Sequence, residues 1–147
     1  MQQTRLIPLA SFLGADLIVV GLGAVLLLRP DWLSYQAELA GREWSELEPA
    51  IQQLWLGQQK MLGSALLAVG ALIAVVLYYP FRRGEYWSRW ALLLAGSWQA
   101  AGALGVLYHQ GIWSPATFPA ALVWAELALF LLGFVLAGGE RSGKETH

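Results

Sequence analysis

Residues 6–28 read LIPLASFLGADLIVVGLGAVLLL, and Asp16 is the one charged side chain in this apolar run. An α-helix rises about 1.5 Å per residue, so a run of this length can cross the roughly 30 Å hydrocarbon core of a bilayer. The apolar region of a secretory signal peptide is shorter, at about 7–15 residues. We therefore interpret residues 6–28 as an uncleaved membrane-spanning helix with an acidic residue at its centre.

Three further apolar runs follow, over about residues 60–79, 88–108 and 118–137. The chain is 57% hydrophobic and 13% charged, whereas about 25% of residues are charged in a typical soluble domain. Because lipid offers no partner for a backbone hydrogen bond, each run is expected to be a helix. The sequence therefore predicts an all-α fold, an integral membrane four-helix bundle over residues 1–138, followed by a disordered polar tail over 139–147.

Composition excludes several kinds of functional site. The chain has no cysteine, which removes thiolate metal sites and cysteine nucleophiles, and its formal net charge of −1 gives no basic field for nucleic acid. His109 ends the third apolar run and His147 lies in the tail, so the histidines form no metal-binding cluster. Ser11, Ser64 and Ser97 have no histidine at comparable depth, and no glycine-rich phosphate loop is present. We expect no metal, no cofactor and no catalytic residue.

The distribution of basic residues predicts the orientation. One side of the membrane carries Arg5, Arg82, Arg83, Arg89, Arg141 and Lys144, and the other carries Arg29, Arg42 and Lys60 among several acidic residues. Lysine and arginine are enriched in cytoplasmic segments of membrane proteins. The sequence therefore predicts that both termini are cytoplasmic and that residues 29–60 form an outer loop.

The end of this outer loop, ELEPAIQQLWLGQQK (residues 46–60), is expected to be helical. Pro49 suits a first helical turn, and Leu47, Ile51, Leu54 and Trp55 fall on one helix face. Three interpretations are open: an interfacial helix, an extension of the second span that caps the bundle, or a surface for a partner.

The hairpin YYPFRRGEYWSRW (residues 78–90) joins the second and third spans and is rich in basic and aromatic residues. We predict lipid contacts for Arg82, Arg83, Arg89, Trp87 and Trp90. A basic side chain near an anionic membrane surface contributes about 1 kcal/mol, and tryptophan favours the interface. The hairpin either anchors the orientation of the bundle or makes a specific lipid or protein contact.

Two segments carry a family resemblance: RRGEYWSRWALL (residues 82–93) and SPATFPAALVWAELALFLLG (residues 114–133). The chain resembles small four-span bacterial membrane proteins that have an R-R-G-E-x-W cytoplasmic hairpin, and its layout is loosely similar to the DoxX-like group. This resemblance implies a multi-pass protein of the bacterial inner membrane, and it carries over no catalytic residue.

Three polar residues are expected at one depth in the membrane. Asp16, Gln99 and Glu126 each lie ten residues, about 15 Å, from the inner end of their helices. Small residues surround Gln99 on its helix face, which predicts that it faces the interior. Trp98 and Trp124 fall near the same depth and are predicted to wall a pocket there. We expect Asp16, Gln99, Glu126, Trp98 and Trp124 to form the site.

The chemistry of this polar layer follows from its surroundings. A carboxylate at the centre of a spanning helix costs roughly 2.5–3.5 kcal/mol on the insertion scale. No lysine or arginine lies at this depth to pair with Asp16 or Glu126. The sequence therefore predicts that at least one carboxyl is protonated at neutral pH. A proton shared between the two acids, with Gln99 bonding to either, would satisfy all three groups.

Three functions remain open. The first is a non-enzymatic membrane protein whose polar layer binds a proton or a small amphipathic or cationic ligand. The second is an accessory or scaffold subunit of a larger membrane complex, in which the layer is a structural clasp. The third is a membrane enzyme acting on a lipid-like substrate through the two carboxyls. The expected partners are the lipid bilayer, a second copy or a membrane-complex subunit, and a small amphipathic ligand, but no nucleic acid.

Overall fold

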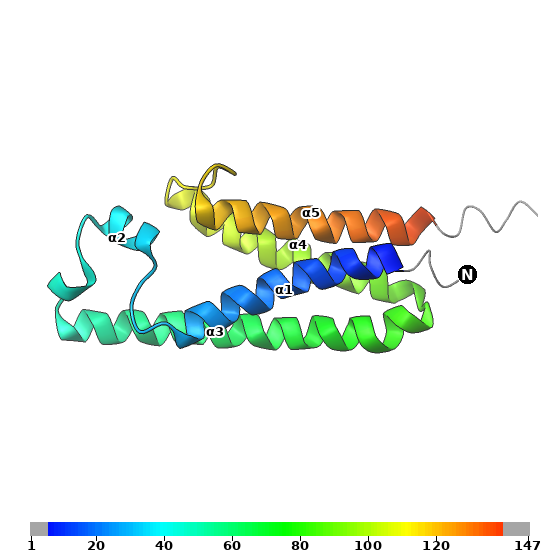
Figure 1. Cartoon of the computed structure of the whole chain (residues 1–147), viewed down its shortest axis with the longest axis horizontal. Helices are drawn as coiled ribbons and strands as arrows, with labels where there is room; N and C mark the ends of the chain where they lie inside the picture. The colour runs from blue at the N-terminus through cyan, green and yellow to red at the C-terminus, as the bar shows by residue number, and fades with distance from the viewer. Residues whose placement is uncertain (1–5, 140–147) are drawn as a thin grey trace, which may run out of the picture. The chain divides into compact units, whose positions relative to one another are not determined.

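The computed structural model describes residues 6–139, and this part of the chain is all-α (Figure 1). The four long helices are α1 (Leu6–Leu28), α3 (Pro49–Val76), α4 (Tyr86–His109) and α5 (Phe118–Gly139). A π-helical turn, η2 (Leu77–Phe81), continues α3 without a break. Each of these four helices is long and apolar enough to cross a membrane. The predicted four-helix transmembrane bundle is therefore confirmed.

The observed helix ends differ from the predicted spans mainly at the start of α3. This helix begins at Pro49 rather than near residue 60, so the extension of the second span is the observed alternative. The loop between α1 and α3 is partly helical, with α2 (Ser34–Ala40) and η1 (Trp44–Glu46). Gly139 still belongs to α5. The rest of the predicted tail lies outside the described residues, as do Arg5, Arg141 and Lys144 of the orientation argument.

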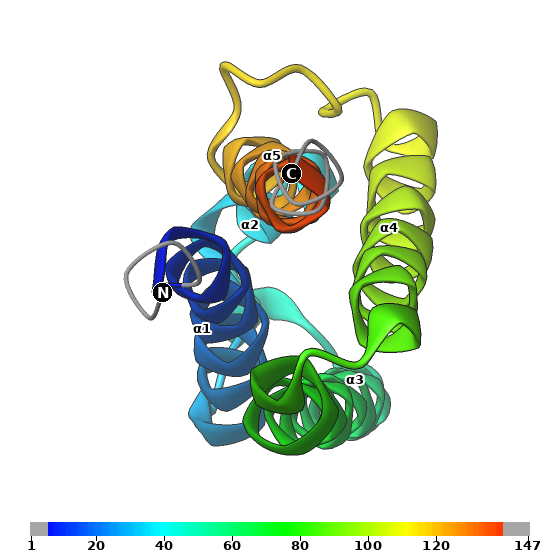
Figure 2. The same ribbon diagram turned by 90° about the vertical axis from the view of Figure 1, so that its right-hand side faces the viewer.

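The chain divides into two compact units, and each is described by itself. One comprises Met1–Ile18 and Gly70–His147, and the other comprises Val19–Val69. The first unit contains all of α4 and α5, which pack against each other and are joined by residues 110–117 (Figure 2). It also contains every residue that the sequence assigned to a site.

Phe12 and Phe130, both fully buried, organise the first unit. The Phe12 ring lies 5.3 Å from the Phe81 ring and 6.1 Å from the Phe130 ring. Gly133 makes room for Phe12, because a Cβ atom there would lie 3.0 Å from the ring, and Gly96 makes room for Phe130 in the same way. Glycine thus allows α1, α4 and α5 to approach around two aromatic rings.

In the second unit, α1 and α3 approach closely at a pair of glycines. A Cβ atom at Gly63 would lie 2.7 Å from the backbone nitrogen of Leu27 and 2.8 Å from the carbonyl oxygen of Gly23. Val19, Leu26 and Leu66 form a buried apolar cluster in this unit. Close backbone contact of this kind is a main source of helix association in lipid.

The side chain of Gln59 caps the C-terminal end of α1. Its amide nitrogen donates to the carbonyl oxygens of Leu26 at 3.3 Å and Asp31 at 3.2 Å, and Gln59 is buried. The last carbonyls of a helix have no intrahelical donor. A side chain from α3 therefore supplies a hydrogen bond that water supplies at an exposed helix end.

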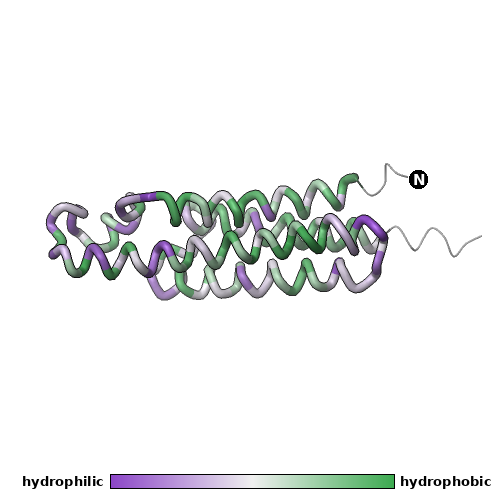
Figure 3. The backbone as a smooth tube through the Cα atoms, turned by 90° about the horizontal axis from the view of Figure 1, so that it is seen from below, coloured by the Kyte–Doolittle hydropathy of each residue, from purple (hydrophilic) through white to green (hydrophobic). Residues whose placement is uncertain are grey.

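The outward surface of the long helices is apolar. Large apolar side chains are exposed along all four, among them Leu17, Leu72, Leu94 and Val135. In Figure 3, hydrophobic residues extend along the lengths of these helices, and hydrophilic residues lie mostly near the helix ends. Exposed apolar side chains on helices long enough to span a bilayer indicate contact with lipid.

The glycine contact in the second unit generates a stability prediction. Gly63→Ala is expected to lower the free energy of unfolding by about 1–3 kcal/mol, because backbone atoms cannot move aside for the new methyl group. Gly57→Ala, on the same helix with no atom near the added methyl, is the control and is expected to be neutral or slightly stabilising. Thermal unfolding in detergent measures both. Equal stability of the two variants would contradict the close approach.

Candidate functional site

Gln99 and Glu126 form a hydrogen-bonded pair between α4 and α5, in which Glu126 is buried and Gln99 is half-buried. With its amide nitrogen turned toward α5, Gln99 donates to both carboxylate oxygens of Glu126, at 3.2 Å for Oε2. Glu126 is 1% exposed. The contact of Gly96 with Phe130 lies one turn away on the two helices, and it sets the register that brings the pair together.

The pair is closed off on its other side by apolar packing. Ala100, Leu107, Ala120 and Val123 form a buried cluster between α4 and α5. The Gln99 amide offers both a donor and an acceptor, so it can bond to a carboxylate or to a protonated carboxyl. Hydrogen bonds between membrane helices contribute about 0.6–2 kcal/mol each. This part of the polar layer therefore clasps two helices whichever form Glu126 takes.

Asp16 differs from Glu126 in its hydrogen bonding. It is 7% exposed, and its Oδ1 atom is buried without a hydrogen-bond partner. Within residues 6–139, the hydrogen bonds of the Gln99 side chain go to Glu126, and none is formed with Asp16. Equal depth in the membrane does not specify the direction of a side chain around its helix axis, and a proton shared between Asp16 and Glu126 stays a prediction.

The two tryptophans at this depth, Trp98 and Trp124, have different surroundings. Trp98 is 85% exposed and does not wall an interior pocket. Consecutive helical residues differ by about 100° in direction, so Gln99 facing α5 turns Trp98 outward. The Trp124 indole N–H donates to the carbonyl oxygen of Trp113 at 3.1 Å, which ties the 110–117 loop to α5. A ligand-binding role for Trp124 stays a prediction.

Arg89 is enclosed by aromatic rings of α4 and α5. Its guanidinium carbon lies 4.2 Å from the centre of the Tyr86 ring, 5.9 Å from Trp90 and 5.5 Å from Phe134. The Trp90 and Phe134 rings meet edge to face at 4.6 Å. Cation–π contacts strengthen when the cation is shielded from water. Arg89 thus holds α4 to α5, and its lipid contact stays a prediction.

The other predicted lipid-contact residues are more accessible. Arg82, Arg83 and Trp87 are exposed, and the Trp87 indole N–H donates to the Glu85 carboxylate at 2.6 Å. The Arg82 guanidinium lies over the Tyr78 ring, 5.3 Å from its centre. Arg82 is thereby held against the helix surface, while Arg83 makes no cation–π contact with the residues that the structure describes.

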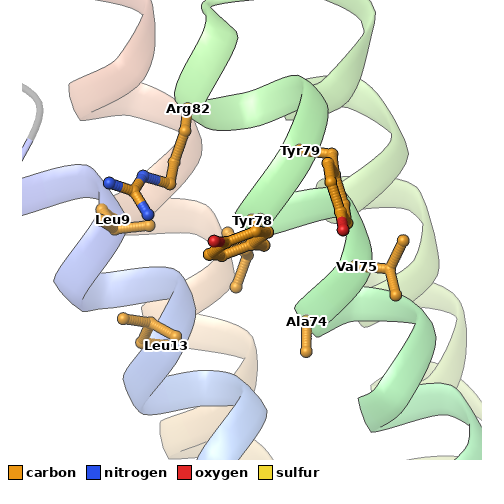
Figure 4. A pocket seen from close by; sticks show the side chains of 8 residues that line it. Leu9, Leu13, Ala74, Val75, Tyr78, Tyr79 and Arg82 are labelled. Atoms are coloured by element: carbon orange, nitrogen blue, oxygen red, sulfur yellow. The ribbon is translucent and has the colours of Figure 1, made fainter.

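A groove of about 480 Å³ lies beside Arg82 in the first unit. Its lining residues are Leu9, Leu13, Ala74, Val75, Leu77, Tyr78, Tyr79 and Arg82, of which Figure 4 shows the side chains. Sequence reasoning missed this groove and also the helix-capping role of Gln59. The spacing of Ala74, Tyr78 and Arg82 on one helix face was the available signal for the groove. The π-helical turn that shapes it has no comparable signal in a hydropathy pattern.

No family model matches the chain, and no curated protein and no solved structure matches it. Its class is therefore defined by the fold and the polar residues themselves. The chain is a polytopic membrane protein, a four-helix transmembrane bundle in which Asp16, Gln59 and Glu126 are buried.

The Gln99–Glu126 pair generates a double-mutant prediction. Gln99→Leu is expected to lower the free energy of unfolding by about 1–3 kcal/mol, because it leaves a buried carboxyl unpartnered. Combining it with Glu126→Leu is expected to recover most of this loss, since apolar groups replace both partners.

Thermal unfolding in detergent of the single and double variants measures the coupling between Gln99 and Glu126. Trp98→Leu is the control next to Gln99, and it is expected to change the stability by less than about 0.5 kcal/mol because Trp98 is exposed. Additive losses for the two leucine substitutions would show that the pair does not hold α4 to α5.

Proposed function

We propose that this chain is a non-enzymatic multi-pass protein of a bacterial inner membrane that binds a proton, or the cationic group of a small amphipathic ligand, at Asp16. Both termini are cytoplasmic in this proposal, following the bias of basic residues and the resemblance of the hairpin to four-span bacterial proteins. The observation that carries it is the buried Oδ1 atom of Asp16, which has no hydrogen-bond partner.

The energetic argument starts from what Asp16 lacks. A buried polar atom without a hydrogen bond costs about 1–3 kcal/mol. Within residues 6–139, no basic side chain pairs with Asp16, so no protein cation offsets a negative charge there. Intramembrane acids commonly serve proton or ion binding. A proton or an ammonium-type cation would supply the donor that the fold leaves out.

The two acids take different roles in this proposal. Glu126 already has Gln99 as a partner, so its carboxyl contributes to holding α4 and α5 together. Asp16 is the residue with a free acceptor. Gln99 and Glu126 therefore have a structural role in this proposal, because they hold together the helices against which α1 packs. Asp16 is the residue that binds the ligand.

A second candidate function is an accessory subunit of a membrane complex, or a homo-oligomer. Ala101, Gly102 and Gly105 are exposed on α4, and the space beside both glycines is open. Small residues on an uncovered face are typical of helix–helix interfaces in membranes. The count of copies in the purified particle, compared between wild type and Gly102→Leu, tests this candidate.

Infrared difference spectroscopy tests the role of Asp16. The wild type is expected to show the carbonyl stretch of a protonated carboxyl, and this band should decrease when dodecylammonium, a cationic amphiphile with N–H donors, is added. Asp16→Asn should remove the band and weaken binding of the cation by at least about tenfold, because the acceptor and its charge are lost. Asp31→Asn, at a partly exposed acid that forms an ion pair with Arg29 just after α1, is the control.

Calorimetric titration of the same proteins measures the affinity directly. Asp16→Asn that binds the cation as tightly as the wild type would overturn the cation assignment. A protonated-carboxyl band that persists in Asp16→Asn and disappears in Glu126→Gln would assign the proton to the other acid.

A further inference from the structure

We propose that the groove beside Arg82 is a binding site for an anionic phospholipid. The phosphate group is held at Arg82, and one acyl chain lies along the apolar wall toward Leu13 and Ala74. This site does not depend on Asp16, so it goes beyond the proposed function and is tested separately from it.

The shape of the groove suits an acyl chain. Its volume of about 480 Å³ lies within the usual range of small-molecule sites, about 300–1,000 Å³. Leu9 and Leu13, one turn apart on α1, form one wall, and Val75 and Tyr78 belong to the opposite wall (Figure 4). Ala74 leaves depth between them because its side chain is small. Apart from Arg82 and the two tyrosine hydroxyls, the lining side chains are apolar.

The π-helical turn η2 gives this groove a fixed wall. Pro80 has no N–H to donate to the carbonyl of Val76, and its ring would crowd that carbonyl in a regular α-helix. The wider π turn accommodates the proline, and it contains Tyr78 and Tyr79, whose rings meet edge to face at 4.9 Å. π-Helical turns of this kind occur often at functional sites. The groove therefore exists before a lipid enters it.

Charge decides which lipid fits. Among residues 6–139, Arg82 is the one charged residue that lines the groove, and no carboxylate of this range forms an ion pair with it. A guanidinium group matches a phosphate through two parallel hydrogen bonds. The exposed Tyr78 lies beside it, and its hydroxyl can donate to the same headgroup (Figure 4). A cation at one end of an apolar trough is complementary to an anionic headgroup with its chain attached.

Native mass spectrometry of the delipidated full-length protein in detergent tests this proposal. Dioleoyl phosphatidylglycerol and dioleoyl phosphatidylcholine, which share their acyl chains, are the probes. The wild type is expected to bind its first phosphatidylglycerol about fivefold more tightly than phosphatidylcholine, the contribution of one interfacial basic residue. Arg82→Gln should abolish this preference. Arg83→Gln, an exposed neighbour outside the groove, should retain it.

A second pair of variants tests the apolar part of the site. Ala74→Phe fills the groove and is expected to weaken the first binding step of both lipids by at least about fivefold. Ala71→Phe, at an exposed alanine one turn earlier and outside the groove, is the control and should bind as the wild type does.

Three results would overturn the assignment. Equal losses for Arg82→Gln and Arg83→Gln would show a general surface charge effect. Unchanged lipid binding by Ala74→Phe would place the lipid elsewhere. A change in the number of protein copies on groove filling, with lipid binding unaltered, would make a second copy of the chain the occupant.

Discussion

The absence of water from the hydrocarbon core determines most features of this protein. Every polar group that enters that region must find its partner within the chain, because an unmet hydrogen bond there costs several kcal/mol on transfer scales. The backbone meets this requirement by forming helices throughout the four spans. Gln59 meets it at the end of α1, and Gln99 meets it for Glu126. Asp16, Gln59 and Arg89 each keep one buried polar atom without a hydrogen-bond partner. Asp16 is the acid among these three residues, which is why it is the centre of the proposed function.

Packing between the helices follows from the same constraint. Apolar side chains have no strong preference for one another over lipid tails. Close approach of the backbones therefore contributes more to helix association in a membrane than it does in water. Gly23 and Gly63 provide this approach in one unit, and Gly96 and Gly133 admit aromatic rings in the other. Small residues and paired polar groups therefore stabilise this bundle together. A uniformly apolar sequence of the same length would specify the helices but not their register.

The sequence was sufficient for the features that depend on hydropathy alone. The four spans, the all-α class and the partly helical loop before α3 could all be predicted, because each rests on many residues acting together. The continuation of α3 back to Pro49 was one of three alternatives for residues 46–60, because a helical pattern does not specify whether the segment continues the span or lies at the interface. Depth in the membrane could also be predicted, and it placed Gln99 and Glu126 at one level correctly.

The direction in which each side chain points around its helix axis could not be predicted with the same success. Trp98 is exposed although it neighbours Gln99, and the Oδ1 atom of Asp16 has no hydrogen-bond partner although Asp16 is predicted to share a depth with Glu126. The groove beside Arg82 depends on the π-helical turn at Pro80, a local geometry that composition does not reveal. Side-chain direction follows from helix rotation, which is determined by tertiary contacts such as that of Phe12 with Gly133.

The different roles of the two buried acids can be compared in one thermal unfolding experiment, on Asp16→Val and Glu126→Leu in detergent. The account predicts that Asp16→Val is as stable as the wild type or more stable by about 1–3 kcal/mol, because it removes an unpartnered atom. It predicts that Glu126→Leu is less stable, because it leaves the Gln99 amide without its partner. Destabilisation of both variants to the same extent would contradict it, since Asp16 would then be a structural partner whose carboxyl the fold requires.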